Sequence, residues 1–227
     1  INEKKIENPY DLSIHRMFNP TDDSIYFRSQ NKLVEEDFKI HGYIFLKNTE
    51  KYFPIYESKM IHHYDHRFGT YKGQTESQRN QGKLPELTEG QHQDPYMLSL
   101  PQNWITSELI DEFIGRKTKK QWLFVYRDIT SSVVLRTAIS TIIPRTATVD
   151  PCRVIYFNDN TPIKNVIVFL GCFNSIIFDY FSRQKVSGNH LAIFVLKQLP
   201  IVSPRRYNII HISFIVPRVL ELTYTAW

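Results

Sequence analysis

One apolar stripe constrains the fold of this chain more than any other feature. Between residues 163 and 183, apolar side chains recur at steps of three and four: Val166, Leu170, Phe173, Ile177 and Phe181. This spacing marks one face of an α-helix. Such a face has to be buried against another layer of structure. We therefore expect a long helix over about 163–183 that packs on a β-sheet.

The sheet is expected from short segments rich in β-branched and aromatic residues. Residues 122–129, 138–144 and 152–157 have this composition, and 190–201 (HLAIFVLKQLPI) shares it. Residues 42–56 contain two further such runs around a polar turn, the pattern of a strand pair. Each of these segments is predicted to be a strand or a strand pair.

Other segments predict a second helix and two irregular regions. Residues 104–115 are apolar at helical spacing, with Ser107 as the expected cap and Gly115 as the stop. Residues 8–27 contain two Asn-Pro pairs and no period, so we expect irregular structure. Residues 71–94 are rich in Gln, Gly and charge and predict a long exposed loop.

These elements predict an α+β fold. We expect a mixed β-sheet or partly open barrel of short strands, packed by the long helix and by the shorter one at about 104–115, with long loops. The expected organisation is an irregular lead-in with the first strands over 1–53, a main domain over 54–201 and a tail over 202–227.

Charge and composition favour an anionic partner. The formal net charge is +5, and the chain has 13 Tyr, 15 Phe and 3 Trp. Cations beside flat aromatic faces suit phosphates and bases, although most of the rings are expected in the core.

The expected cellular location follows from segments that the sequence lacks. No stretch approaches the roughly 18 apolar residues of a membrane helix, and Ile1–Glu7 lack the apolar run of a secretory signal. We expect a cytoplasmic protein with no membrane partner. Cys152 and Cys172 have no CxxC or Cys/His spacing, so we expect two reduced thiols and no zinc.

The densest polar cluster is Lys59–Tyr71, with the sequence KMIHHYDHRFGTY. Lys59 and Arg67 are candidates to hold DNA phosphates. The candidate readers of base edges are His62, His63, Asp65 and His66. Two alternatives remain for this cluster: the same four residues as metal ligands of a nuclease, since imidazole and carboxylate bind divalent ions, or a solvated turn around a buried Tyr.

Two more clusters carry cations. In Val125–Thr137, Arg127 is a candidate DNA contact, and an ion pair of Asp128 with Arg127 or Arg136 is the structural alternative. In Phe178–Leu191, three neighbouring residues are candidate contacts: Arg183, Gln184 and Lys185. Gln can pair with adenine, but Arg and Lys at a helix C-terminus also complement the helix dipole without a ligand.

Motifs for methyl transfer are missing. The sequence has no Gly-rich methyl-donor loop after a strand and no Asn/Asp-Pro-Pro-aromatic tetrad to hold a flipped base. The NPY at Asn8–Tyr10 lacks the second proline, so we do not interpret it as a catalytic loop. We expect no catalytic residue and no cofactor in this chain.

Three segments nevertheless resemble one protein family in the same order. PIYESKMIHHYDHRFGTY (54–71) resembles the PLYEGKMIxxFDHRxxxY signature of large bacterial Type IIG-like restriction-modification methyltransferases. WLFVYRDITSSVVLRTAISTIIP (122–144) resembles that family's W-x-L-x-F-R-D-I-T followed by E-R-T and I-I-P. Residues 170–201 resemble its Leu and Asn-Ser helix and closing Q-L-P. Departures are Ser58 in place of a usual Gly and Leu135 in place of a common acidic residue.

The resemblance implies a TaqI-like C-terminal specificity domain. Such a domain reads double-stranded DNA and lies beside the methyltransferase domain of its parent protein. The parent transfers a methyl group from S-adenosylmethionine to adenine, a chemistry of phage-defence systems, and residues 54–201 are then the target-recognition domain. The ending LELTYTAW resembles family sequence interrupted in mid-course, which suggests a fragment. A metal-dependent nuclease fragment and a subunit-docking module remain the alternatives.

Overall fold

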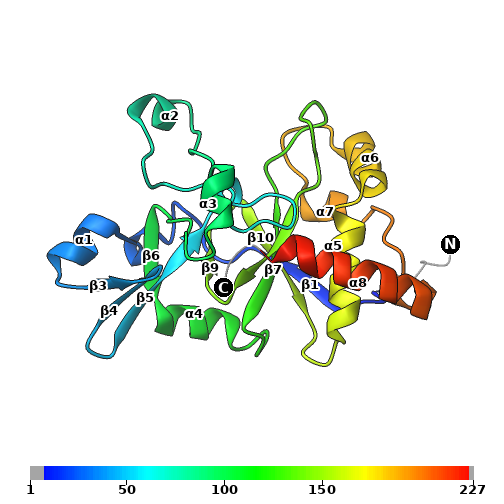
Figure 1. Cartoon of the computed structure of the whole chain (residues 1–227), viewed down its shortest axis with the longest axis horizontal. Coiled ribbons are helices and arrows are strands. Elements are labelled where there is room, and N and C mark those ends of the chain that lie inside the picture. Colours follow the sequence, from blue (N-terminus) through cyan, green and yellow to red (C-terminus); the bar gives the residue numbers. More distant parts are fainter. Residues whose placement is uncertain (1–7, 225–227) are drawn as a thin grey trace.

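The computed structural model describes residues 8–224 and shows an α+β fold with two β-sheets and helices packed around them (Figure 1). One sheet is curled into a half-barrel. The predicted fold class, a mixed sheet or partly open barrel with helices and long loops, is confirmed. The start of the lead-in, residues 1–7, and the last three residues of the tail lie outside the described residues.

The elements alternate along the chain with long connecting loops. The strands are β1 (Leu12–His15), β2 (Arg28–Ser29), β3 (Lys39–His41), β4 (Ile44–Lys47), β5 (Glu50–Tyr56), β6 (Asn103–Thr106), β7 (Trp122–Arg127), β8 (Ser140–Pro144), β9 (Ala147–Thr148) and β10 (Cys152–Phe157). The α-helices are α1 (Gln30–Glu35), α2 (Glu76–Asn80), α3 (Glu89–Gln93), α4 (Ser107–Ile114), α5 (Ile163–Phe173), α6 (Ile176–Lys185), α7 (Ile193–Leu196) and α8 (Ile209–Thr223). Short 3-10 helices are η1 (Ser24–Tyr26), η2 (Ser58–Met60) and η3 (Pro204–Arg206).

The first sheet is antiparallel, with the strand order β1-β10-β7-β8. It contains the strands predicted within 122–129, 138–144 and 152–157, which are confirmed. The prediction that residues 8–27 are irregular is wrong at β1. Leu12 pairs with Phe157 of β10 in that strand, a partner far along the chain that no local pattern shows.

The second sheet has the order β2-β6-β5-β4-β3, and β9 pairs in parallel with β5. The strand pair predicted within 42–56 is confirmed as β4 and β5. Asn48 lies in the turn between them with a φ of 53°, in the left-handed region that Asn tolerates better than most residues.

The first sheet is packed on both faces. Alternate residues such as Phe124 and Phe157 point into one core, which α5 and the helices after it cover. Their neighbours Leu123 and Val125 point into a second core with residues of β5 and α4. The predicted lead-in (1–53) and tail (202–227) also contribute to the first of these cores, through β1 and α8.

The predicted single helix over 163–183 is wrong in two respects. The structure has two helices, α5 and α6, bent by 61°, and two residues of the predicted buried stripe, Ile177 and Phe181, are 71% and 42% exposed. The break falls at Asn174 and Ser175. The Ser175 hydroxyl caps α6 by accepting a hydrogen bond from the backbone N–H of Phe178. The apolar stripe continues across the break, so periodicity alone does not show it.

The helix predicted over 104–115 begins later than expected. Trp104 and Ile105 are buried in β6, and α4 starts at Ser107, with Thr106 at the cap position. Ser107 is therefore the first helical residue and not the cap. Gly115 ends the helix as predicted.

The strand predicted over 190–201 is wrong. Only His190 forms a bridge, with Ile129, and the segment continues into the short helix α7. Val195, Leu196 and Leu199 are buried against the core at helical spacing. Tertiary burial decides this segment, because its β-branched composition alone favours a strand.

The loop predicted over 71–94 is long and projects from the molecule, but it holds two short helices. Each starts at a capping box, formed by Thr75 with Gln78 for α2 and by Thr88 with Gln91 for α3. In the tail, α8 packs on α5, and Val219 lies close to Gly171.

Within residues 8–224, no single helix has both the length and the apolar composition to cross a membrane; α5 and α6 qualify only as a bent pair. Both cysteines are free, with Cys152 buried and Cys172 half-buried, as predicted for two reduced thiols.

Candidate functional site

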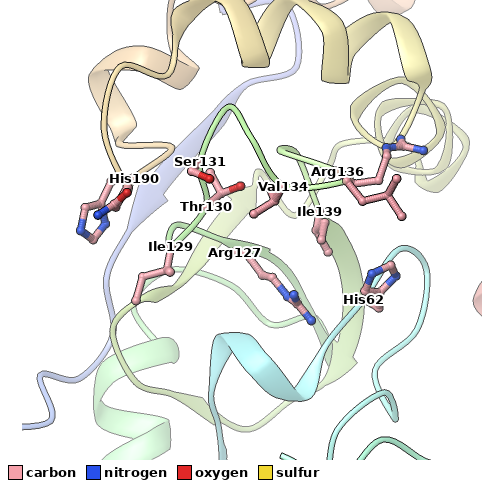
Figure 2. Close-up of a pocket in the computed structure, with 11 residues that line it drawn as sticks. His62, Arg127, Ile129, Thr130, Ser131, Val134, Arg136, Ile139 and His190 are labelled. Carbon is pink, nitrogen blue, oxygen red and sulfur yellow. The ribbon is translucent and has the colours of Figure 1, made fainter. Parts of the chain in front are cut away.

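The three polar clusters meet around one cavity of about 590 Å³ (Figure 2). The cavity opens where β7 ends, and the loop that follows this strand forms much of its wall. We call residues 129–137 the 129–137 loop. The lining residues are His62, Arg127, Ile129, Thr130, Ser131, Val134, Leu135, Arg136, Ile139, Asn189 and His190. The fold thus joins segments that are at least 50 residues apart in the sequence.

Arg127 lies at the centre of this arrangement, at the end of β7 (Figure 2). Its guanidinium donates a hydrogen bond to the carbonyl of Ile61 and lies over the ring of Phe68, 5.5 Å from the ring centre. Within the described part of the chain, no carboxylate is within 4.0 Å of it. Burial lowers the pKa of Arg127 to about 10, so the group is still a cation at neutral pH.

His62 lies beside Arg127, and both side chains contact the ring of Phe68. The His62 ring centre lies 4.6 Å from that of Phe68. Burial, and then the nearby charge of Arg127, lower the pKa of His62 to about 4. The imidazole is therefore neutral at pH 7 and offers one donor and one acceptor.

A buried carboxylate holds the 129–137 loop against α6. Asp179 accepts hydrogen bonds from the backbone N–H groups of Thr137 (2.6 Å) and Ala138 (2.9 Å). It also forms ion pairs with Arg136 (3.6 Å) and Arg183 (3.4 Å). These four contacts fix the wall of the cavity to the helix.

Arg183 holds the outer part of the loop. Its guanidinium donates to the carbonyls of Val134 (2.9 Å) and Leu135 (2.7 Å). The side chain of Leu135 is 91% exposed and that of Val133 is 89% exposed, so the loop presents apolar side chains to solvent. The main role of Arg183 in this structure is therefore to hold the loop, and a third of its side chain remains exposed.

The other rim of the cavity is held by Asp128. This buried carboxylate pairs with Arg153 at 2.6 Å and with His190 at 3.3 Å. The alternative of an ion pair with Arg127 or Arg136 is wrong, because Arg153, on the neighbouring strand β10, takes that place.

The prediction that Arg67 holds a DNA phosphate is corrected by the structure, because the side chain is buried. It is 1% exposed, and its guanidinium donates to the carbonyls of His92 (2.9 Å), Asp94 (2.8 Å) and Met97 (2.7 Å). Arg67 therefore fixes the end of the 71–97 segment from inside and is not available to DNA in this structure.

The remaining members of the first cluster point in different directions. His63 bonds the carbonyl of Ala138 at 2.9 Å, and Asp65 accepts from the backbone N–H of Arg67 at 2.7 Å. His66 lines another cavity, and burial lowers its pKa to about 4. Within residues 8–224, no three His, Cys, Asp or Glu side chains are grouped to hold a metal ion. The nuclease alternative thus lacks a converging ligand set.

Three predicted contacts lie on the surface or near it. Lys59 pairs with Glu57 at 3.7 Å and lies over the Tyr71 ring. Gln184 and Lys185 are exposed at the end of α6, just before the segment that brings Asn189 and His190 to the cavity. The structure brings His62 and Arg127 together at the cavity and places the other predicted contacts outside its lining.

Sequence reasoning missed several residues of this site. The hydroxyls of Thr130 and Ser131, the amide of Asn189 and the imidazole of His190 all line the cavity. All four lie within the segments on which the family resemblance rests. Their place in those segments was the one feature that could have singled them out.

Comparisons with protein-family models, with curated proteins and with solved structures find no match. The assignment of a function therefore depends on the residues and geometry of the chain itself.

Proposed function

We propose that this chain is a DNA-contacting specificity domain of an adenine-specific methyltransferase of the restriction-modification type. It grips double-stranded DNA and reads a target, and methyl transfer takes place in another domain of the parent protein. In this proposal the chain itself is not catalytic, binds no cofactor and acts in the cytoplasm.

The convergence of the three family-like segments on one cavity is the observation that carries this proposal. His62 comes from the first segment, the 129–137 loop from the second, and Asn189 and His190 from the third. Such a meeting of distant loops is how rigid folds commonly build binding sites. The described lining contains two arginines and no carboxylate, as a surface that receives phosphates requires.

Exposed polar groups beside the cavity extend this surface. Gln184 and Lys185 lie at the end of α6, and in this proposal Lys185 contacts a phosphate. Gln184 offers the paired donor and acceptor that fit an adenine edge. Both are solvent-exposed, so their replacement leaves the core intact.

The test is a fluorescence-anisotropy titration of the full chain with a labelled duplex over a range of salt concentrations. We expect Lys185→Ala to weaken binding and to reduce the salt slope by about one contact. Lys39→Ala, at an exposed position of β3 in the second sheet, is the matched control and should change nothing. Binding by the wild type that is indifferent to both changes would remove the end of α6 from the interface.

A second candidate, docking on the methyltransferase domain of the parent, is favoured by the outer face of α6. Ile176, Ile177 and Tyr180 are all more than half exposed there, and Phe181 is 42% exposed. Exposed apolar patches of this kind mark interaction sites. If Ile177→Glu leaves DNA binding by the isolated chain unchanged but removes the extra affinity gained when the methyltransferase domain is present, α6 serves docking and not DNA contact.

A further inference from the structure

The Arg127 guanidinium makes one hydrogen bond and no ion pair, fewer than the guanidinium of any other buried or half-buried arginine in the described part of the chain. Arg153 pairs with Asp128 and Asp150, Arg136 pairs with Asp179, and Arg67 donates to three carbonyls. Arg127 has one carbonyl and one aromatic face. Its Nε is buried without a hydrogen-bond acceptor in the described part of the chain, as are those of Arg67 and Arg136, so the difference lies in the rest of the guanidinium.

Such a group is costly unless something else completes it. A guanidinium carries five N–H donors in a planar fork and keeps its charge at neutral pH. Removing it from water without an opposing charge is unfavourable, and a protein normally supplies a carboxylate. Here Glu86 and Cys152 act on Arg127 only at a distance, with no ion pair to either.

The surroundings of Arg127 suit an oxyanion. Thr130 and Ser131 add hydroxyl groups to the wall and Asn189 adds an amide. On the remaining sides the cavity is apolar, with Val134, Leu135 and Ile139. A volume of about 590 Å³ lies in the range of small-ligand sites and exceeds what a lone anion needs.

We propose that this cavity binds a molecule that carries a phosphate group, with the phosphate held by Arg127; the Ser131 hydroxyl and the Asn189 amide line the same cavity and contact other polar atoms of that molecule. Arginine is the residue best shaped for two parallel hydrogen bonds to phosphate oxygens. The apolar walls then face the uncharged part of the molecule that carries the phosphate. This inference rests on the proposed function when the phosphate belongs to a DNA strand, and the same chemistry would also bind free phosphate.

The first arm of the test measures thermal unfolding of the full chain in phosphate and in chloride at equal ionic strength. A ligand that binds the folded state raises Tm. We expect phosphate to raise the Tm of the wild type and of Arg116→Gln, an exposed control after α4. The rise should be clearly smaller in Arg127→Gln, which keeps only the general stabilisation that phosphate gives to folded proteins.

The second arm measures binding of a labelled duplex. Loss of a charged hydrogen-bonding group should weaken binding about tenfold in Arg127→Gln and reduce the salt slope by about one contact. Ser131→Ala and Asn189→Ala keep the buried arginine and should each weaken binding by a few fold, so that a folding defect of Arg127→Gln does not decide the matter.

The outcomes separate the two sources of phosphate. Phosphate stabilisation that depends on Arg127, with duplex binding unaffected by the variants, supports the oxyanion site but excludes the DNA strand as its source. The same stabilisation without any duplex binding by the wild type overturns the proposed function and leaves the phosphate site standing. An equal rise of Tm in phosphate for the wild type and Arg127→Gln, together with unchanged duplex binding by all three variants, overturns the inference.

Discussion

Asn174 and Ser140 form a reciprocal pair of hydrogen bonds. The Asn174 amide oxygen accepts from the backbone N–H of Ser140 at 3.0 Å, and its amide nitrogen donates to the Ser140 carbonyl at 2.9 Å. The Ser140 hydroxyl donates to the same amide oxygen at 3.1 Å. Through this pair, the break between α5 and α6 is attached to the first residue of β8.

We expect Asn174→Ala to destabilise the protein by about 3 kcal/mol, because it leaves a buried backbone donor of Ser140 without a partner. Chemical denaturation measures the change. Asn80→Ala, at an exposed position of α2, is the control and should change stability by less than about 0.5 kcal/mol. An equal effect of the two variants would show that the pair contributes little.

Asp179→Asn should loosen the 129–137 loop. The change keeps the shape of the side chain but removes the charge that faces Arg136 and Arg183. We expect a loss of about 2 kcal/mol and faster amide exchange at Thr137 and Ala138. Hydrogen exchange followed by mass spectrometry measures this, and protection equal to that of the wild type would contradict it.

Arg67→Met should reduce stability by about 3 kcal/mol, since a buried guanidinium and its three hydrogen bonds to backbone carbonyls are lost. Arg67→Lys should also lose stability, because a single ammonium nitrogen cannot reach three carbonyls as the planar guanidinium does. Below its lowered Tm, Arg67→Met should bind duplex with the salt slope of the wild type. A reduced slope would return Arg67 to the DNA contacts.

Stability should fall as the pH drops from about 6.5 towards 4. Burial lowers the pKa of both His62 and His66 from 6.5 to about 4, so the folded chain binds fewer protons than the unfolded chain in this range. The stabilisation is complete above the unfolded pKa and is lost as the pH approaches the folded pKa. Urea denaturation between pH 7 and pH 4.5 measures it.

In the same series, His62→Gln should flatten the pH dependence by up to about 1.4 kcal/mol per pH unit, the value for one proton. His41→Gln, at an exposed position of β3, should leave the slope as it is. A slope that is the same in all three proteins would assign the acid sensitivity to other groups.

How far the sequence anticipated the structure depended on the range of the interactions. The strands at 122–127, 140–144 and 152–157 and the hairpin of β4 and β5 have a local composition that matches their final state. For 190–201, local composition and tertiary burial disagree, and burial decides. β1 is an extreme case, because its partner β10 is about 140 residues away.

The candidate site shows the same division. The residue types at 59–71, 125–137 and 178–191 predicted a polar site, and His62 and Arg127 do line one cavity. Sequence alone could not distinguish Arg67 from Arg127, since both are arginines in polar segments. The three carbonyls that surround Arg67 come from a loop 25 to 30 residues further along the chain.

The sequence by itself determined the α+β class, five of the described strands (β4, β5, β7, β8 and β10) and the three segments from which the cavity is built, because these follow from local periodicity and residue type. The tertiary structure decided which cationic side chains are paired with acceptors inside the protein and which remain available to a ligand. The physical reason is that an arginine is satisfied by any acceptor that the fold brings close, and long-range packing alone sets which acceptors those are.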